Sequence, residues 1–119
     1  MVKYRYLRNE RGVNTGEITN RILCFIDEHI EEELTTARVA DEAGYSPFYF
    51  SRIFKNEMGI TLKDYVTRRK LVKASEKIVS GYRVIDAALQ YGWETHAGFT
   101  KAFKKGVWLQ SIFFEVYVK

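Results

Sequence analysis

The sequence has few of the residues that mark secreted, fibrous or membrane proteins. Among its 119 residues there is one cysteine, Cys24, one proline and eight glycines. A lone cysteine cannot form an internal disulfide or a cysteine-based zinc site, and it suits a reducing compartment. So little proline and glycine excludes collagen-like and low-complexity chains. No apolar run approaches the ~20 residues that span a bilayer, and none follows the basic N-terminal residues, so we expect a cytoplasmic protein without membrane span or signal peptide.

What the chain does contain is a globular composition with an uneven charge. Hydrophobic residues make up 46% and charged residues 29%, which fits one folded domain of this length rather than a disordered chain. Residues 1–33 hold five Lys and Arg against seven Asp and Glu, whereas residues 34–119 hold fourteen against eight. A basic region of this kind is typical of a surface that binds a polyanion.

The spacing of apolar residues predicts helices throughout the chain. Capping residues and glycines set the bounds: Thr35 and Ser46 are expected to begin helices, and Gly44 and Gly59 to end them. Only residues 113–118 alternate enough to suggest a strand. The chain is expected to begin with an N-terminal arm over 1–16 and to end with a tail over 106–119. The helices predicted between them cover 17–32, 36–43, 47–58, 61–79, 83–91 and 95–105. The aromatic residues expected in the core are Phe50, Phe54, Tyr65, Trp93, Phe99 and Phe103.

An internal repeat organises the chain from about residue 39 to residue 104. Ala40 followed by Gly44 matches Ala88 followed by Gly92 at an offset of 48 residues, and one extra residue follows the second glycine. At an offset of 49, the pairs are Ser46 with Thr95, Phe50 with Phe99, Arg52 with Lys101, Phe54 with Phe103 and Lys55 with Lys104. The small residue permits a close helix crossing, and the glycine supplies a sharp turn. Each copy therefore predicts a helix-turn-helix, whose second helix enters a DNA major groove; a plain helical bundle is the alternative.

Two long segments carry a family resemblance. AGYSPFYFSRIFKNEMGITLKDYVTRRKLVKA and VIDAALQYGWETHAGFTKAFKK resemble the DNA-binding domain of the AraC/XylS family of bacterial transcription regulators, over about 18–105. The resemblance implies an all-α, homeodomain-like fold of about seven helices. Two helix-turn-helix units, about 35–59 and 83–105, would be joined by the helix over 61–79. At ~1.5 Å per residue this helix spans roughly 28 Å, so it is expected to hold two recognition helices in successive major grooves, ~34 Å apart.

The resemblance also implies which side chains meet DNA. Those expected to contact bases are Phe48, Ser51 and Arg52 in the first unit and His96, Ala97, Thr100 and Lys101 in the second. Those expected to contact phosphates are Lys55, Arg69, Lys104 and Lys105. The guanidinium of Arg52 matches guanine O6 and N7, although a surface salt bridge is its alternative role. Two further residues have two possible roles each. Phe48 contacts a thymine methyl group or covers the end of the helix, and His96 contacts a base or is a solvated side chain.

The family pattern breaks after residue 105. Its usual ending, with a glycine, a Ser/Thr-Pro pair and an aromatic residue before an arginine, is replaced by GVWLQSIFFEVYVK. One possible coding string for residues 106–111, GGA GTT TGG TTA CAG TCC, gives Glu-Phe-Gly-Tyr-Ser when read one base later. We hypothesise a one-base frameshift near Lys105; an intact upstream frame without the family ending at the source locus refutes it. The alternative is a divergent last helix that packs Trp108, Ile112 and Phe113 on the second unit.

The sequence shows no catalytic pattern. Ser-His-Asp, paired-carboxylate and phosphate-binding glycine motifs are absent at the required spacings, so we expect no enzyme activity, cofactor or metal. We expect a sequence-specific transcription regulator whose partners are double-stranded DNA at an asymmetric promoter site and RNA polymerase. Family members often carry an effector or dimerisation domain, which this chain lacks room for. The alternative is a helical protein-interaction module, or a variant whose DNA binding is impaired by a frameshifted C-terminus.

Overall fold

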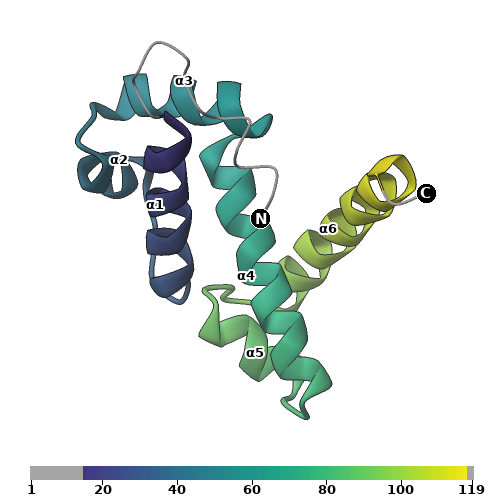
Figure 1. The fold of residues 1–119 in the computed structure, drawn as a ribbon. Coiled ribbons are helices and arrows are strands. Elements are labelled where there is room, and N and C mark those ends of the chain that lie inside the picture. Colours follow the sequence, from purple (N-terminus) through teal and green to yellow (C-terminus); the bar gives the residue numbers. More distant parts are fainter. Residues whose placement is uncertain (1–14, 118–119) are drawn as a thin grey trace. The chain divides into compact units, whose positions relative to one another are not determined.

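The computed structural model describes the backbone of residues 15–117 and the side chains of residues 20–106. Within this range the chain is all helical, which confirms the all-α prediction, with six helices against about seven expected (Figure 1). They are α1 (Thr15–Glu28), α2 (Thr36–Ala43), α3 (Pro47–Met58), α4 (Leu62–Val79), α5 (Val84–Gln90) and α6 (His96–Tyr117). Most of the predicted N-terminal arm, residues 1–14, lies outside the described residues.

The chain divides into two compact units, Met1–Val66 and Thr67–Lys119. The first unit contains α1, α2, α3 and the first turn of α4. The second contains the remainder of α4 together with α5 and α6. Each copy of the sequence repeat therefore lies within its own unit, and each unit is described by itself below.

The bounds of α2 and α3 agree with the prediction because local caps set them. The hydroxyl of Thr35 accepts a hydrogen bond from the Arg38 N–H at 3.1 Å, and the Ser46 hydroxyl accepts one from the Tyr49 N–H at 3.3 Å. Each bond satisfies a backbone donor that the first helical turn leaves unpaired. At the other end of α2, Gly44 adopts a φ of 82°, the left-handed conformation that glycine adopts without strain.

Helix α1 ends earlier than predicted, at Glu28 instead of residue 32. The chain turns there: the Glu32 N–H donates to the His29 carbonyl at 2.9 Å, and the His29 ring lies 2.9 Å by its Nδ1 from the Phe25 carbonyl. The physical reason lies in the acidic run 31–33, which in a longer helix would meet the partial negative charge of the helix C-terminus.

Helix α6 ends later than predicted, at Tyr117 instead of residue 105. The expected tail therefore begins as a continuation of this helix, and residues 113–117 of the suggested strand are helical instead. The sequence past residue 105 contains no proline to stop the helix, and Gly106 is accommodated inside it. The predicted packing of Trp108, Ile112 and Phe113 lies outside the described side chains.

The core of the first unit forms between its helices as the periodicity predicted. Ile22, Ile26, Val39 and Phe54 are its largest fully buried side chains. Tyr65, also expected in the core, is half-buried and meets the Phe54 ring edge-on at a centroid distance of 5.7 Å. The first turn of α4 thus covers the inner face of α3.

The core of the second unit contains one error in the prediction. Phe99 is buried and meets the half-buried Trp93 ring edge-on at 5.2 Å, but Phe103 is 36% exposed. Its ring stacks on Phe99 at 5.9 Å. In the first unit, the matching residue Phe54 is covered by the helix that follows. No described helix follows α6, so Phe103 stays partly open to solvent.

Candidate nucleic-acid interface

The turn between α2 and α3 fixes the direction of α3. The Gly44 N–H donates to the Asp41 carbonyl at 3.1 Å, and the Tyr45 N–H donates to the Ala40 carbonyl at 3.0 Å. Pro47 then occupies the first position of α3, where its missing N–H costs no hydrogen bond. These contacts satisfy the free carbonyls at the end of α2 and start α3 within a few residues.

Helix α3 has a buried face and an exposed, polar face. Phe50 and Phe54 point into the core, while Phe48 is 74% exposed and lies beside Arg52, whose guanidinium carbon is 5.9 Å from its ring centroid. A shallow cavity of about 420 Å³ on the exposed side is lined by Thr36, Phe48, Ser51, Arg52, Lys55, Asn56, Thr61, Leu62 and Lys63. The structure therefore brings together the three base-contacting residues predicted for this unit and the phosphate-contacting Lys55.

The connection between the two helices is two residues longer in the second unit, with five residues (91–95) against three (44–46) in the first. Tyr91 follows α5 with a φ of −104°, and the positive φ of 102° falls on Gly92. The Trp93 N–H donates to the Ala88 carbonyl at 2.9 Å, which closes the turn. The extra residue that the sequence alignment places after the glycine is thus accommodated between the turn and α6.

The first turns of α6 carry the second predicted group of base-contacting residues. His96, Ala97 and Lys101 are exposed, and Thr100 is half-buried. The Thr100 hydroxyl lies 3.3 Å from the His96 Nδ1, so the two side chains form one polar pair on this helix. Further along α6, the predicted phosphate contacts Lys104 and Lys105 are both exposed.

One predicted phosphate contact belongs to neither recognition helix. Arg69 is half-buried on α4, in the second unit. Conversely, Asn56 and Lys63 line the exposed side of α3 and were not singled out from the sequence. Asn56 follows Arg52 by four residues, so helical spacing alone places it on the same face.

Neither a metal-binding cluster nor a membrane-spanning helix is found in the part of the chain that the structure describes. No three His, Cys, Asp or Glu side chains there are grouped so that they could hold a metal ion. No helix in the described range is long and apolar enough to cross a membrane.

Two helix-turn-helix units with basic second helices define a DNA-binding class of protein, and comparisons with known proteins identify its family. A profile described as a helix-turn-helix domain matches residues 39–107. The multiple antibiotic resistance protein MarA of Escherichia coli is 33% identical over 93 residues, which cover 76% of this chain and 73% of MarA. The solved C-terminal domain of AraT, a response regulator from Geobacillus stearothermophilus, is 33% identical with a TM-score of 0.68, over 75% of each chain. The chain belongs to the AraC-type family of helix-turn-helix transcription regulators.

Relatives in this family differ in length. The HTH-type transcriptional regulator YbfP of Bacillus subtilis is 33% identical over 86 residues, or 71% of this chain. The matched segment spans only 29% of YbfP, so the chain corresponds to a minor part of that relative.

Proposed function

We propose that the chain regulates transcription by binding double-stranded DNA sequence-specifically, with α3 and the first turns of α6 as recognition helices in successive major grooves. The observation that carries this proposal is the exposed face of α3, where Phe48, Ser51 and Arg52 lie together beside Lys55. A helix fits the major groove with one face toward the base edges, and its opposite face must then be held by a protein core. Helix α3 meets both conditions.

In the first unit, Arg52 is the principal base reader. Its guanidinium donates two parallel hydrogen bonds to guanine O6 and N7. The adjacent Phe48 ring restricts where the guanidinium lies and offers an apolar surface for a thymine methyl group. Ser51, one position away on the same helix, donates to or accepts from a neighbouring base.

In the second unit, a chemically different set reads the other part of the site. Lys101 donates to guanine, and His96 and Thr100 offer a linked donor and acceptor. Ala97 provides only apolar contact. Because these side chains differ from those of α3, the two halves of the proposed target differ in sequence, and the site is asymmetric.

Four basic residues are assigned to the DNA backbone: Lys55, Arg69, Lys104 and Lys105. Contacts with phosphates raise affinity for any sequence and make binding fall steeply as salt rises. Lys104 and Lys105 follow the base-reading turns of α6, so they extend the contact along the strand.

The first experiment is selection of bound duplexes from a random pool at moderate salt, followed by sequencing. We expect two different short motifs about one helical turn apart. One motif alone would show that only one unit reads sequence. Salt-sensitive binding without any enriched motif, or no binding at all, would contradict sequence-specific regulation and favour a protein-interaction module.

Substitutions then separate base reading from phosphate contact. Arg52→Ala should cost about 1–3 kcal/mol of binding free energy and relax the base preference at one position of the DNA site. Lys104→Ala should weaken the binding of all DNA sequences equally, and it should lower the slope of log K against log salt concentration by about one. Arg21→Ala is a charge-matched control, because Arg21 lies on α1 and pairs with Glu42 at 3.5 Å. If Arg21→Ala and Arg52→Ala weaken binding alike without changing the motif, Arg52 is not a base reader.

A further inference from the structure

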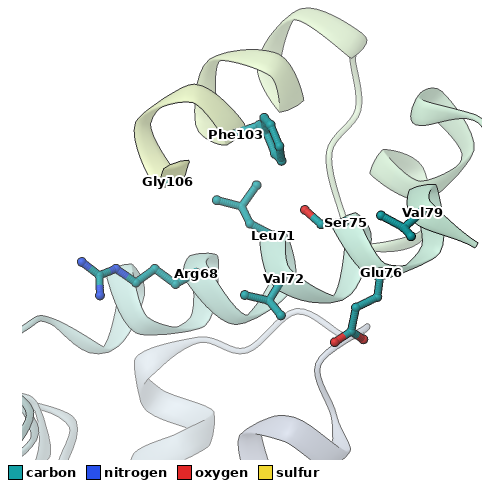
Figure 2. A pocket seen from close by; sticks show the side chains of 8 residues that line it. All are labelled: Arg68, Leu71, Val72, Ser75, Glu76, Val79, Phe103 and Gly106. Carbon is teal, nitrogen blue, oxygen red and sulfur yellow. The ribbon is translucent and has the colours of Figure 1, made fainter. Parts of the chain in front are cut away.

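The second unit carries an apolar groove that is separate from the proposed DNA-reading residues. Its volume is about 410 Å³, and its lining residues are Arg68, Leu71, Val72, Ser75, Glu76, Val79, Phe103 and Gly106. Figure 2 shows Phe103 of α6 pointing toward Leu71 and Ser75 of α4. Val79, at the end of α4, is 88% exposed. This surface places large apolar side chains in water.

The internal repeat indicates what kind of element is missing from the groove. In the first unit, the inner aromatic residue of the recognition helix, Phe54, is 2% exposed because Tyr65 of the next helix covers it. The matching residue of the second unit, Phe103, lines the open groove instead. A helix with apolar residues is therefore the occupant that the repeat itself specifies.

The chain contains one such helix beyond the groove. The segment 107–117 continues α6, and the sequence VWLQSIFFEVY holds a single charged residue, Glu115. A helix that is apolar over most of its positions needs burial. This segment does not turn back onto its own groove, because α6 passes Gly106 without interruption (Figure 1). Gly106 itself packs tightly on α4, since a Cβ there would lie 2.6 Å from the Leu71 Cδ1.

We propose that the chain forms a symmetric dimer in which helix segment 107–117 of each copy occupies the groove of the other. Every copy has both the groove and the apolar helix segment. A single two-fold symmetric arrangement therefore fills both grooves and buries both segments. The groove also offers an unused donor: the Arg68 Nε is buried and has no hydrogen-bond partner among the described residues. The sequence of the incoming segment contains one acidic residue, Glu115, and a carboxylate is the kind of group that accepts a hydrogen bond from a guanidinium. The dimer does not depend on the proposed DNA binding.

Sedimentation velocity of the full chain over a wide concentration range tests this dimer. We expect a reversible monomer–dimer equilibrium, and Val79→Asp should raise the dissociation constant at least tenfold by placing a charge in the groove. Leu89→Asp is the matched control, because Leu89 is a 55% exposed apolar residue of α5 outside the groove. A monomer at every concentration, or equal effects of the two substitutions, would overturn the proposal. Aggregates without a defined size would overturn it as well.

Cross-linking identifies the occupant directly. Val79→Cys in a Cys24→Ser background carries a photoactivatable cross-linker at the groove, and isotopically light and heavy chains are mixed before illumination. We expect mixed-isotope products joining position 79 to peptides from 107–117. Products formed within one chain would show that the segment covers its own groove, and products with other peptides would show a different interface; either result overturns the dimer.

Discussion

The two units begin from the same repeat and differ in how it ends. Helix α3 stops at Gly59, which adopts a φ of 79°, and the chain returns as α4 to place Tyr65 against Phe54. In the second unit, the position that matches Gly59 is Trp108, and α6 runs on to Tyr117. A glycine in the left-handed conformation thus ends α3, whereas the matching position of the second unit is a tryptophan inside α6.

The first helices of the two repeat copies, α2 and α5, also differ in their N-caps. The N-cap of α2 is Thr35, whose hydroxyl caps the first turn, whereas the N-cap of α5 is Arg83, which makes no side-chain capping bond. Arg83 instead pairs with Asp86 at 2.9 Å, and the hydrogen bond and charge of that carboxylate raise the pKa of the guanidinium. An exposed pair of this kind stabilises a helix little. We infer that α5 is held mainly by the burial of Ala87 and Ala88.

The largest expected difference between the two units is the loss of stability when the matched aromatic residues, Phe54 and Phe103, are replaced by alanine. Phe54→Ala should lower the free energy of unfolding by about 3–5 kcal/mol, because it leaves a cavity in a closed core. Phe103→Ala should cost about 1 kcal/mol at low protein concentration, since part of the ring is already in water. Urea unfolding followed by circular dichroism measures both. Equal losses would show that the second unit is closed like the first.

A smaller effect is expected at the two turn glycines. Gly44→Ala should cost about 1–2 kcal/mol, because a φ of 82° is strained for alanine. Gly92→Ala should cost at least as much, since its φ of 102° lies further from the left-handed minimum near +57°. A Cβ would meet no atom within 4 Å at either position, so the cost is conformational. Thermal unfolding measures it, and an unchanged midpoint for Gly44→Ala would contradict the turn's need for glycine.

Prediction from sequence succeeded at the bounds of α2 and α3 and failed at the exposure of Phe103, and the two cases differ in how far along the chain the deciding contacts lie. The bounds of α2 and α3 follow from Thr35, Ser46 and the turn glycines, all within a few residues. The exposure of Phe103 depends on a covering helix that does not follow α6, and local spacing cannot reveal that.

In the candidate site, too, the residues set by one helix were predicted and a residue brought in by the fold was not. Helical spacing and the family resemblance were enough to place Phe48, Ser51 and Arg52 on one exposed face, because that face is set by α3 alone. Lys63 joins the same cavity from the start of α4, and only the fold brings it there. The base-reading and phosphate-contacting roles themselves stay predictions until the DNA experiments are made.

The smallest effect concerns the N-caps. Arg83→Thr should stabilise the second unit by about 0.5–1 kcal/mol, since a threonine hydroxyl caps α5 and the exposed ion pair that is lost contributes little. Thr35→Ala should destabilise the first unit by about 1 kcal/mol, because it removes the bond to the Arg38 N–H. Opposite shifts in the urea midpoint would confirm that the units differ at this end. If Arg83→Thr destabilises instead, the pair with Asp86 stabilises α5 by more than a threonine cap does, and the missing N-cap is then not what distinguishes the second copy of the repeat from the first.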